Sequence, residues 1–470
     1  MKPSTRIVAL LTAITALSCS ARDNVIGALA GAGSPGADQA NAGASGTQTD
    51  TGGSAGSPAS SAGSAGTSNT EPAQAGAAGK LTDSGGSSSG GSSGSTNGGS
   101  GGGSAGTGEV AGIGGSIVNH GSGDGTFGLH VDYATGERPV AVVLSDFNAD
   151  GKLDLATANS EYNVNTVSVL LGNGDGTFAP KVDYATGNEA RALATGDLNG
   201  DDKPDIVVAN STAGTASVLL GKGDGTFAAK VDYGTAGRPN SVALADLNAD
   251  GRLDLVAADT GSNKVSVLLG KGDGTFSPKA DYATGTEPNS VASGDFNGDG
   301  KLDLVSSSYA GTVSVLLGLG GGKFGSENEF SVGSGPQLVV VGDLNGDHQL
   351  DIATASAYAT AVSILFGDGT GNFAVHVDFE TASYPISLAL ADLNDDDKLD
   401  IAVAGTFGDA VSVLLGTGGG MFARKVDYPT PTNPNSVAFG DLNGDGKLDL
   451  VTANYGAASA SVLLGLGAAK

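Results

Sequence analysis

The stretch DFNGDGKLD, residues 295–303, decides the fold, because its spacing of acidic residues occurs seven times in the chain. The pattern Asp-x-Asn-x-Asp recurs at intervals of 48 to 51 residues. A period of about 50 residues is typical of propellers, solenoids and other repeat arrays. The seven copies begin at Asp146, Asp197, Asp246, Asp295, Asp343, Asp392 and Asp441.

Each copy also contains short runs of β-branched and aliphatic residues. In the copy quoted above, these runs are residues 290–294, 302–305 and 313–317. In most copies a fourth run follows, in which GDGTF leads into KVDY or a variant, as at residues 223–233. Runs of this length between Gly, Asp and Asn turns predict strands, and each copy leaves no room for a helix. The sequence therefore predicts an all-β, seven-bladed β-propeller of four-stranded antiparallel blades.

The two ends of the repeat region predict how the ring closes. The last copy ends at residues 461–467, where every earlier copy continues into the GDGTF run or a variant of it. The missing run stands at the other end of the region, in residues 123–133. We therefore expect the N-terminal strand to complete the last blade, because this pairing removes an exposed strand edge.

The acidic loops carry the ligand pattern of a hard cation. Oxygen-bearing side chains recur at the first, third, fifth and ninth positions, and the seventh residue can offer its backbone carbonyl. Calcium takes about 6 to 8 oxygen ligands in flexible geometry, which suits this set better than magnesium. Gly at the sixth position permits a left-handed turn. Three loops depart from this pattern, with Asp202, His348 and Asp397 at that position, and we expect weaker sites there.

The predicted calcium ligands, up to seven sites in all, share these five positions of each loop. They are Asp146, Asn148, Asp150, Lys152 and Asp154; Asp197, Asn199, Asp201, Lys203 and Asp205; Asp246, Asn248, Asp250, Arg252 and Asp254; Asp295, Asn297, Asp299, Lys301 and Asp303; Asp343, Asn345, Asp347, Gln349 and Asp351; Asp392, Asn394, Asp396, Lys398 and Asp400; and Asp441, Asn443, Asp445, Lys447 and Asp449.

Three other interpretations of the acidic loops were weighed. An EF-hand needs a carboxylate at its twelfth position and flanking helices, whereas here the ninth position closes the loop between strands. A calcium-binding β-helix needs its Gly-Asp signature every nine residues, whereas GDGT occurs once per copy. The remaining alternative is that the segments are Asx-type hairpin turns without metal.

The repeated loop resembles the FG-GAP and VCBS repeat family, the seven-bladed propellers that also occur in integrin α subunits. The resemblance covers residues 117–470. It implies that each acidic loop joins the innermost strand to the second strand of its blade and binds calcium. The propeller domain is accordingly assigned to residues 116–470.

The N-terminal region predicts export. Residues 1–18 have a positive start and an apolar stretch, as a signal peptide does. Ala16 to Cys19 resemble a bacterial lipobox, which implies that Cys19 is lipidated, and the alternative is an ordinary signal peptide. Residues 19–115, rich in Gly, Ser and Ala, predict a disordered tether. We therefore expect a lipoprotein anchored at the cell envelope or surface, or otherwise a secreted protein.

Charge and cysteine content limit the partners. The net charge is −27, so nucleic acid would be repelled, while divalent cations would be attracted. Cys19 is the only cysteine, which excludes an intramolecular disulfide. Contact with a membrane is expected only through the lipid anchor, and the propeller is expected to be a monomer.

Function is predicted as binding rather than catalysis. Residues 116–470 contain no GxSxG or HExxH motif, and the four histidines of the chain share no common phase except for His130 and His376. A ring of aromatics in the loops between second and third strands predicts a face for a protein or glycan ligand. The linkers that enter the inner strands share this face and contribute Glu137, Arg138, Arg191, Arg238 and Tyr384. The aromatics are Tyr162, Tyr309, Tyr358, Phe407 and Tyr455.

The predicted function is thus a calcium-binding adhesion or ligand-binding module, with no catalytic residues. The alternative is a carbohydrate-active enzyme of the polysaccharide lyase type, which rests on analogy between propellers.

Overall fold

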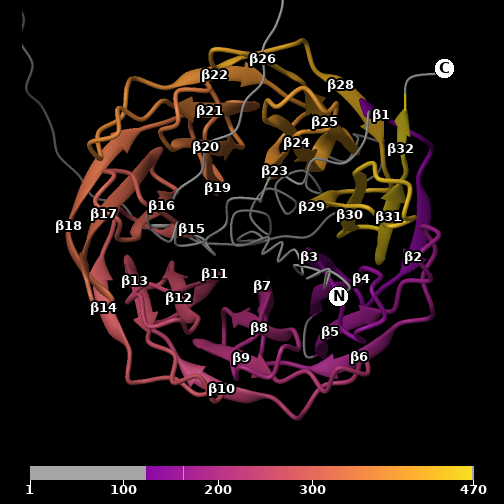
Figure 1. Cartoon of the computed structure of the whole chain (residues 1–470), viewed down its shortest axis with the longest axis horizontal. Coiled ribbons are helices and arrows are strands. Elements are labelled where there is room, and N and C mark those ends of the chain that lie inside the picture. The colour runs from indigo at the N-terminus through magenta and orange to yellow at the C-terminus, as the bar shows by residue number, and fades with distance from the viewer. Residues whose placement is uncertain (1–122, 162–163, 468–470) are drawn as a thin grey trace, which may run out of the picture. The chain divides into compact units, whose positions relative to one another are not determined.

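The computed structural model describes residues 123–161 and 164–467. In these residues, seven four-stranded antiparallel sheets surround a common centre (Figure 1). One 3₁₀ turn, η1 (Thr406–Gly408), is the single helical element of this part of the chain. The predicted fold class, an all-β seven-bladed propeller, is confirmed. Cys19 and the segments assigned as signal peptide and tether lie outside the described residues.

Six blades have their strands in chain order from the centre outward, and the last blade has β29, β30 and β31 followed by β2 as its outer strand. The innermost strands are β3 (Pro139–Ser145), β7 (Ala190–Gly196), β11 (Pro239–Ala245), β15 (Pro288–Gly294), β19 (Pro336–Gly342), β23 (Pro385–Ala391) and β29 (Pro434–Gly440). The second strands are β4 (Asp154–Glu161), β8 (Asp205–Asn210), β12 (Asp254–Asp259), β16 (Asp303–Ser308), β20 (Asp351–Ser356), β24 (Asp400–Gly405) and β30 (Asp449–Asn454).

The outer half of each blade consists of a third and a fourth strand. The third strands are β5 (Val164–Leu170), β9 (Thr215–Leu219), β13 (Lys264–Leu268), β17 (Thr312–Gly320), β21 (Ala361–Leu365), β25 (Ala410–Leu414) and β31 (Ser459–Leu463). The outer strands are β6 (Val182–Ala185), β10 (Val231–Gly234), β14 (Ala280–Ala283), β18 (Lys323–Ser331), β22 (Val377–Glu380), β28 (Val426–Pro429) and β2 (Val131–Ala134). A small extra pair, β26 (Gly416–Gly418) with β27 (Met421–Phe422), follows β25.

The core lies between neighbouring blades. The inner strands β3, β7 and β11 are buried along their whole length, since both of their faces pack against adjacent sheets. One cluster joins Val142 of the first blade, Leu193 of the second and Val451 of the last. Burial on both faces explains why these strands are nearly continuous runs of apolar and small residues rather than alternating ones.

The N-terminal strands close the ring. Strand β2 pairs with β31, so the last blade takes its outer strand from the N-terminal end. In addition, β1 (Gly123–Phe127) pairs with β32 (Gly465–Gly467). Phe127 meets the ring of Tyr428 edge-on, with 5.3 Å between centroids. The predicted closure is confirmed, and it leaves the last blade without an unpaired third strand.

The tyrosines of the recurring Asp-Tyr pairs in the outer strands contact the next blade. Tyr184 of β6 packs edge-on against Phe227 of the next blade, with 5.2 Å between ring centroids. Its hydroxyl donates a hydrogen bond to the carbonyl of Gly225, 3.3 Å away. Tyr233 and Tyr282 repeat this contact with Phe276 and Phe324. These tyrosines are therefore structural.

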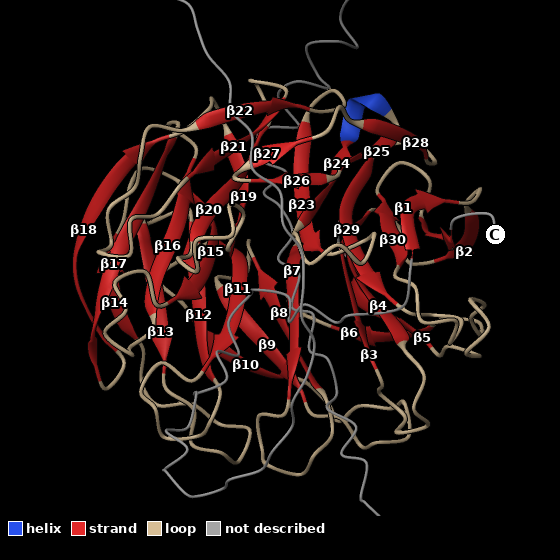
Figure 2. Ribbon diagram, turned by 45° about the horizontal axis from the view of Figure 1, so that its top comes forward, coloured by secondary structure: helices blue, strands red, loops and turns tan. Residues whose placement is uncertain are grey.

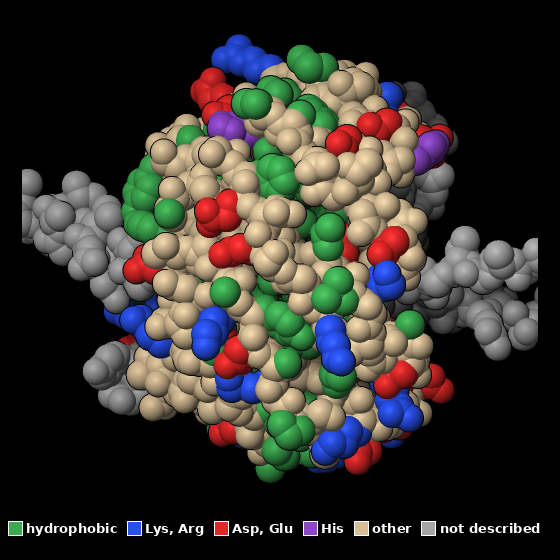
Figure 3. All heavy atoms as spheres, turned by 90° about the vertical axis from the view of Figure 1, so that its left-hand side faces the viewer, with side chains coloured by type: hydrophobic (Ala, Val, Ile, Leu, Met, Phe, Trp, Pro, Cys, Tyr) green, Lys and Arg blue, Asp and Glu red, His purple; other side chains and the backbone are tan. Residues whose placement is uncertain are grey.

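The rim and the two ends of the ring differ in character. Outer strands expose apolar residues such as Val182 beside ion pairs such as Lys181–Asp183, and charged edge residues discourage pairing with other chains. Acidic, basic and apolar side chains are interspersed on the side seen in Figure 3. Loops lie at both ends of the strands (Figure 2). Among the described residues, no helix is long and apolar enough to cross a membrane.

Candidate metal loops and the opposite face

Each acidic loop connects the inner strand of a blade to its second strand. In the first loop, the carboxylate of Asp146 accepts the backbone N–H of Asp150 at 3.1 Å and of Gly151 at 2.8 Å. Asn148 Oδ1 accepts the N–H of Asp150 at 2.9 Å, and Asp150 Oδ1 accepts that of Lys152 at 3.0 Å. The short polar side chains thus bond to the backbone a few residues ahead and curl the loop tightly.

The sixth position takes a positive φ in all seven loops, as the sequence predicted. Gly151 has φ 79°, and the departing residues Asp202, His348 and Asp397 have φ 60°, 66° and 60°. Each of these three residues donates its N–H to the first carboxylate of its own loop, at 2.7, 2.8 and 2.8 Å. The three loops without Gly at the sixth position therefore keep the same backbone conformation as the other four.

The aspartate at the ninth position of each loop has a structural role that the sequence did not indicate. Asp154 is fully buried, and its two oxygens accept the N–H of Phe147 at 2.9 Å and of Gly172 at 2.7 Å. It therefore joins the acidic loop to the turn after the third strand. Burial raises the pKa of Asp154 to about 6, although these hydrogen bonds oppose the shift. The corresponding aspartates make the same two bonds, and burial raises the pKa of Asp400 to about 7.

The fifth carboxylate is exposed and pairs with the side chain of the seventh residue in six loops. Lys301 Nζ lies 2.7 Å from Asp299 and lowers the pKa of that carboxyl. In the fifth loop Gln349 replaces the basic residue, and His348 Nδ1 lies 3.7 Å from Asp343. The acidic loops are thus partly neutralised by their own side chains.

The donor set fits calcium by its chemistry. Each loop offers carboxylate and amide oxygens with spare lone pairs. The third-position oxygens Asn248 Oδ1 and Asn394 Oδ1 are buried and have no hydrogen-bond partner, and a buried unpaired oxygen is a group that an ion or water would satisfy. Within residues 123–161 and 164–467, however, no three carboxylate, histidine or cysteine side chains form a group that could hold a metal. The metal ligands therefore remain a prediction.

The opposite face carries a continuous row of aromatic rings across three blades. Tyr309 meets Tyr358 edge-on at a centroid distance of 5.9 Å, and their hydroxyls share a hydrogen bond. Tyr358 meets Tyr384 at 5.6 Å, and Tyr384 meets Phe407 at 4.6 Å. We call these four residues the aromatic row. Antiparallel connectivity places it at the end of the blades away from the acidic loops.

The other predicted ligand-face residues lie apart from this row. Arg138 lies over the ring of Tyr455, with 5.7 Å from Cζ to the centroid. Its Nε lies 3.4 Å from Glu161. Tyr162 lies outside the described residues, so the predicted five-membered ring has four members that can be placed.

A recurring positive φ immediately before each inner strand was also missed from the sequence. The residues share values between 53° and 65°, and they are Arg138, Glu189, Arg238, Glu287, Gly335, Tyr384 and Asn433. Only one of them is Gly, so the residue type does not indicate a positive φ. Only their equivalent positions in the repeat could have indicated that all seven share one backbone conformation.

Fold and repeat together define the class, a seven-bladed propeller with one acidic loop per blade. The FG-GAP-like repeat matches residues 146–208, 197–257, 246–306, 295–354, 343–403 and 394–452, so the chain belongs to this family. No curated protein matches the chain.

Solved structures are similar in fold. BBS1N in complex with ARL6DN, from a crystal soaked with mercury, is 12% identical with a TM-score of 0.52, covering 75% of this chain and 99% of that one. A protein from Bacteroides fragilis, provisionally assigned as a 6-phosphogluconolactonase, is 19% identical with a TM-score of 0.48, covering 63% of this chain and 86% of that one. At these identities the first similarity shows the fold alone, and the second carries no argument.

Proposed function

We propose that the chain is a calcium-binding propeller that recognises a protein or glycan ligand outside the cell. The observation that carries the binding assignment is the aromatic row. Tyr358 and Phe407 expose 47% and 37% of their surface, although each ring already contacts its neighbours. Preassembled aromatic rings offer a large contact area at low cost in conformational entropy.

A direct test of ligand binding uses arrays of glycans and extracellular proteins. Tyr358→Ala should reduce the affinity for any ligand found by about 10-fold, the effect of losing one well-placed contact of about 1.4 kcal/mol. Leu129→Ala is the matched control, because Leu129 is 93% exposed on the rim. Equal loss of binding in both variants, or no loss in either, would contradict the aromatic row as the binding surface.

The calcium assignment is supported by seven equivalent oxygen-rich loops and by the unpaired amide oxygens of Asn248 and Asn394. Calcium that binds the folded state alone should raise its stability by mass action. The melting temperature should therefore fall on dialysis against a chelator and return with calcium, and elemental analysis should give up to seven ions per chain. Asp150→Asn should lower the ion count by one, while Val182→Ala should not change it. Unchanged melting after chelation would leave the loops as metal-free turns.

Export and anchoring are proposed from residues 1–19. Radiolabelled palmitate should be incorporated into the native chain and not into a Cys19→Ala variant. Release of that variant into the medium or periplasm would support the anchor, whereas membrane retention without label would contradict it.

Activity on an acidic polysaccharide is the competing function. Incubation with such polymers, followed by analysis of chain length, distinguishes the two. Shortened products would favour the enzyme, and intact polymer retained by the protein would favour the binding module.

A further inference from the structure

A buried arginine stands at the ligand-face end of the second blade. Arg191 is the second residue of β7 and is only 3% exposed. It lies at a register shift between Ala190 and Ala192, where the pairing with β8 is irregular. Such bulges redirect side chains and often occur next to binding sites.

The guanidinium of Arg191 is only partly satisfied. Nη2 pairs with Glu189, whose other oxygen accepts the hydroxyl of Thr212. Nε and Nη1 are buried and have no hydrogen-bond partner. Because buried charged donors are costly when unpaired, these two N–H groups require an acceptor that the described residues do not supply.

A second arginine lies close by on the next blade. Arg238 immediately precedes β11, the inner strand that packs against β7. It is exposed and has no ion-pair partner among the described residues, whereas Arg138 on the other neighbouring blade pairs with Glu161. Burial lowers the pKa of Arg191 to about 10, and the positive charge of Arg238 adds to this effect. Two guanidiniums that repel each other, with free N–H groups, form a site for an anion.

We propose that Arg191 and Arg238 bind a carboxylate of an acidic sugar chain. This inference rests on the proposed ligand-binding function and specifies its ligand class. Arginine forms short charge-assisted hydrogen bonds with carboxylates. A sugar chain fits better than a peptide because this end of the blades exposes aromatic surface at Tyr358 and Phe407 and offers no unpaired strand edge, among the described residues, to which a peptide β-strand could add.

Backbone conformation provides variants that should fold. Arg238 has φ 53°, and Gly335 occupies the equivalent position of the fifth blade with φ 65°. Arg238→Gly therefore removes the cation at a position where Gly is already accepted, and its melting temperature should be unchanged or higher. Lys271→Asn is the charge-matched control, since Lys271 is exposed in the turn after β13 of the same blade, belongs to none of the predicted sites, and has Asn173 at its equivalent position in the first blade.

The test measures calorimetric binding of trigalacturonate and of its fully methyl-esterified form to the full chain. The acid should bind the native protein at least about 10-fold more tightly than the ester, and Arg238→Gly and Arg191→Gln should each lose this difference, while Lys271→Asn keeps it. A 10-fold loss corresponds to one lost interaction of about 1.4 kcal/mol. If Arg191→Gln fails to fold, Arg238→Gly alone decides, because its melting temperature reports its folding independently.

The outcomes separate the two levels of the proposal. Equal binding of acid and ester, or native-like binding by Arg238→Gly, overturns the carboxylate site but keeps a glycan-binding function. Preference for oligo-aspartate over trigalacturonate overturns the sugar assignment. No binding of either sugar or of the peptide, together with blank glycan and protein arrays, overturns the proposed function itself.

Discussion

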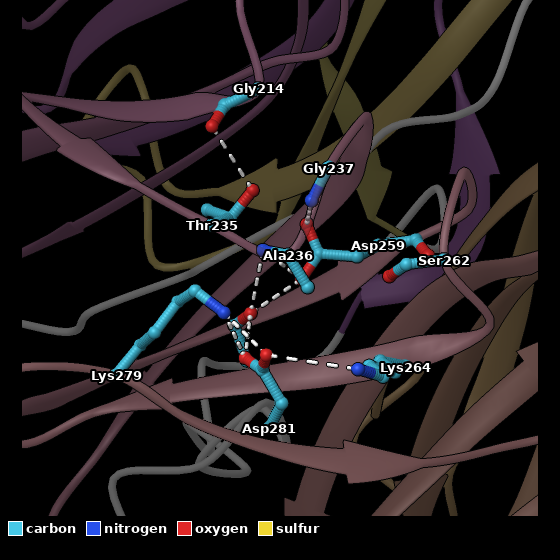
Figure 4. A network of polar contacts seen from close by, with 10 residues as sticks. Gly214, Thr235, Ala236, Gly237, Asp259, Ser262, Lys264, Lys279 and Asp281 are labelled. Atoms are coloured by element: carbon cyan, nitrogen blue, oxygen red, sulfur yellow. Dashed lines mark hydrogen bonds and ion pairs between the residues drawn. The ribbon is translucent and has the colours of Figure 1, made fainter.

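Asp259 is a buried carboxylate at a position where three other blades have Asn. In those blades the amide donates to a serine hydroxyl, as Asn210 Nδ2 does to Ser217 Oγ at 2.7 Å, and that hydroxyl donates to an outer-strand aspartate at 2.6 Å. In the third blade, Ser266 Oγ lies 2.6 Å from Asp259 and 3.0 Å from Asp281. Figure 4 shows Asp259 beside the backbone of Ala236 and Gly237, and Asp281 beside Lys264 and Lys279. One hydroxyl proton cannot serve both carboxylates, so one of the two contacts of Ser266 brings a hydroxyl oxygen against a carboxylate oxygen without a proton between them.

Asp259→Asn should therefore stabilise the propeller at neutral pH. The new amide donates to Ser266, whose proton is then free for Asp281, and the gain should be about 1 kcal/mol, the net contribution of one hydrogen bond. Burial raises the pKa of Asp259, although hydrogen bonds from Ser266 and from the N–H groups of Ala236 and Gly237 oppose this. The folded state thus holds its proton to higher pH than the unfolded chain does.

The sign of the pH dependence follows from this difference. Below about pH 4 both states are protonated, and protonated Asp259 can donate to Ser266 as Asn would, so the variant and the native protein should be equally stable. As pH rises, the unfolded chain ionises first and the native protein loses stability until the raised pKa is passed. The advantage of Asp259→Asn should therefore appear with rising pH and then become constant.

Urea unfolding at several pH values, with calcium held constant, measures this effect. Asn210→Asp is the matched reverse variant, because it creates the same conflict between Ser217 and Asp232 in the second blade. It should destabilise at pH 7 by a similar amount and recover at low pH. A loss of stability in Asp259→Asn at pH 7, or the same difference at every pH, would refute the shared-proton explanation.

Two further predictions concern close packing and closure. Gly172→Ala should destabilise the propeller by several kcal/mol, because the new Cβ would lie 2.1 Å from the carbonyl oxygen of Leu153. Gly151→Ala should cost only about 1 to 2 kcal/mol, because Gly151 has open space around it and the cost comes from its φ of 79° alone. Equal losses of stability in thermal unfolding would contradict the steric argument. Deleting residues 1–115 should leave the propeller monomeric and folded, while deleting 1–134 removes β1 and β2 and should cause unfolding or aggregation by size-exclusion chromatography.

The fold could be predicted from the sequence because each blade repeats the same local signals in the same phase. Gly, Asp and Asn mark the turns, and the runs between them, such as residues 313–317, have the length and composition of strands. The closure of the ring could be predicted because residues 123–133 correspond to the outer-strand part of the repeat, which the last copy lacks. These patterns are local or periodic, so they can be interpreted from the sequence without knowledge of tertiary contacts.

The candidate sites could be predicted only in part, because their roles depend on contacts between distant residues. Asp154 was expected as a ligand alone, and its bond to Gly172, 18 residues away, emerges only when the third strand folds back. Arg191 looks like any linker arginine in the sequence, and only the packed blades show that it is buried and incompletely paired. Asp259 differs from Asn210 only in having a carboxylate in place of an amide. The consequence arises because the hydroxyl of Ser266 contacts both Asp259 and Asp281.

The residues before the inner strands combine a strained backbone with polar or aromatic side chains. Six of the seven have positive φ without being Gly, and this conformation costs about 1 to 2 kcal/mol for a residue with a Cβ. Gly335 shows that the blade accepts Gly at this position, so the fold does not require Arg, Glu, Tyr or Asn there. Stability alone would favour Gly around the whole ring. Some of these side chains have partners within the protein, since Arg138 pairs with Glu161 and Glu189 pairs with Arg191. Arg238 has no ion-pair partner among the described residues, and under the proposed function a bound anion would supply one.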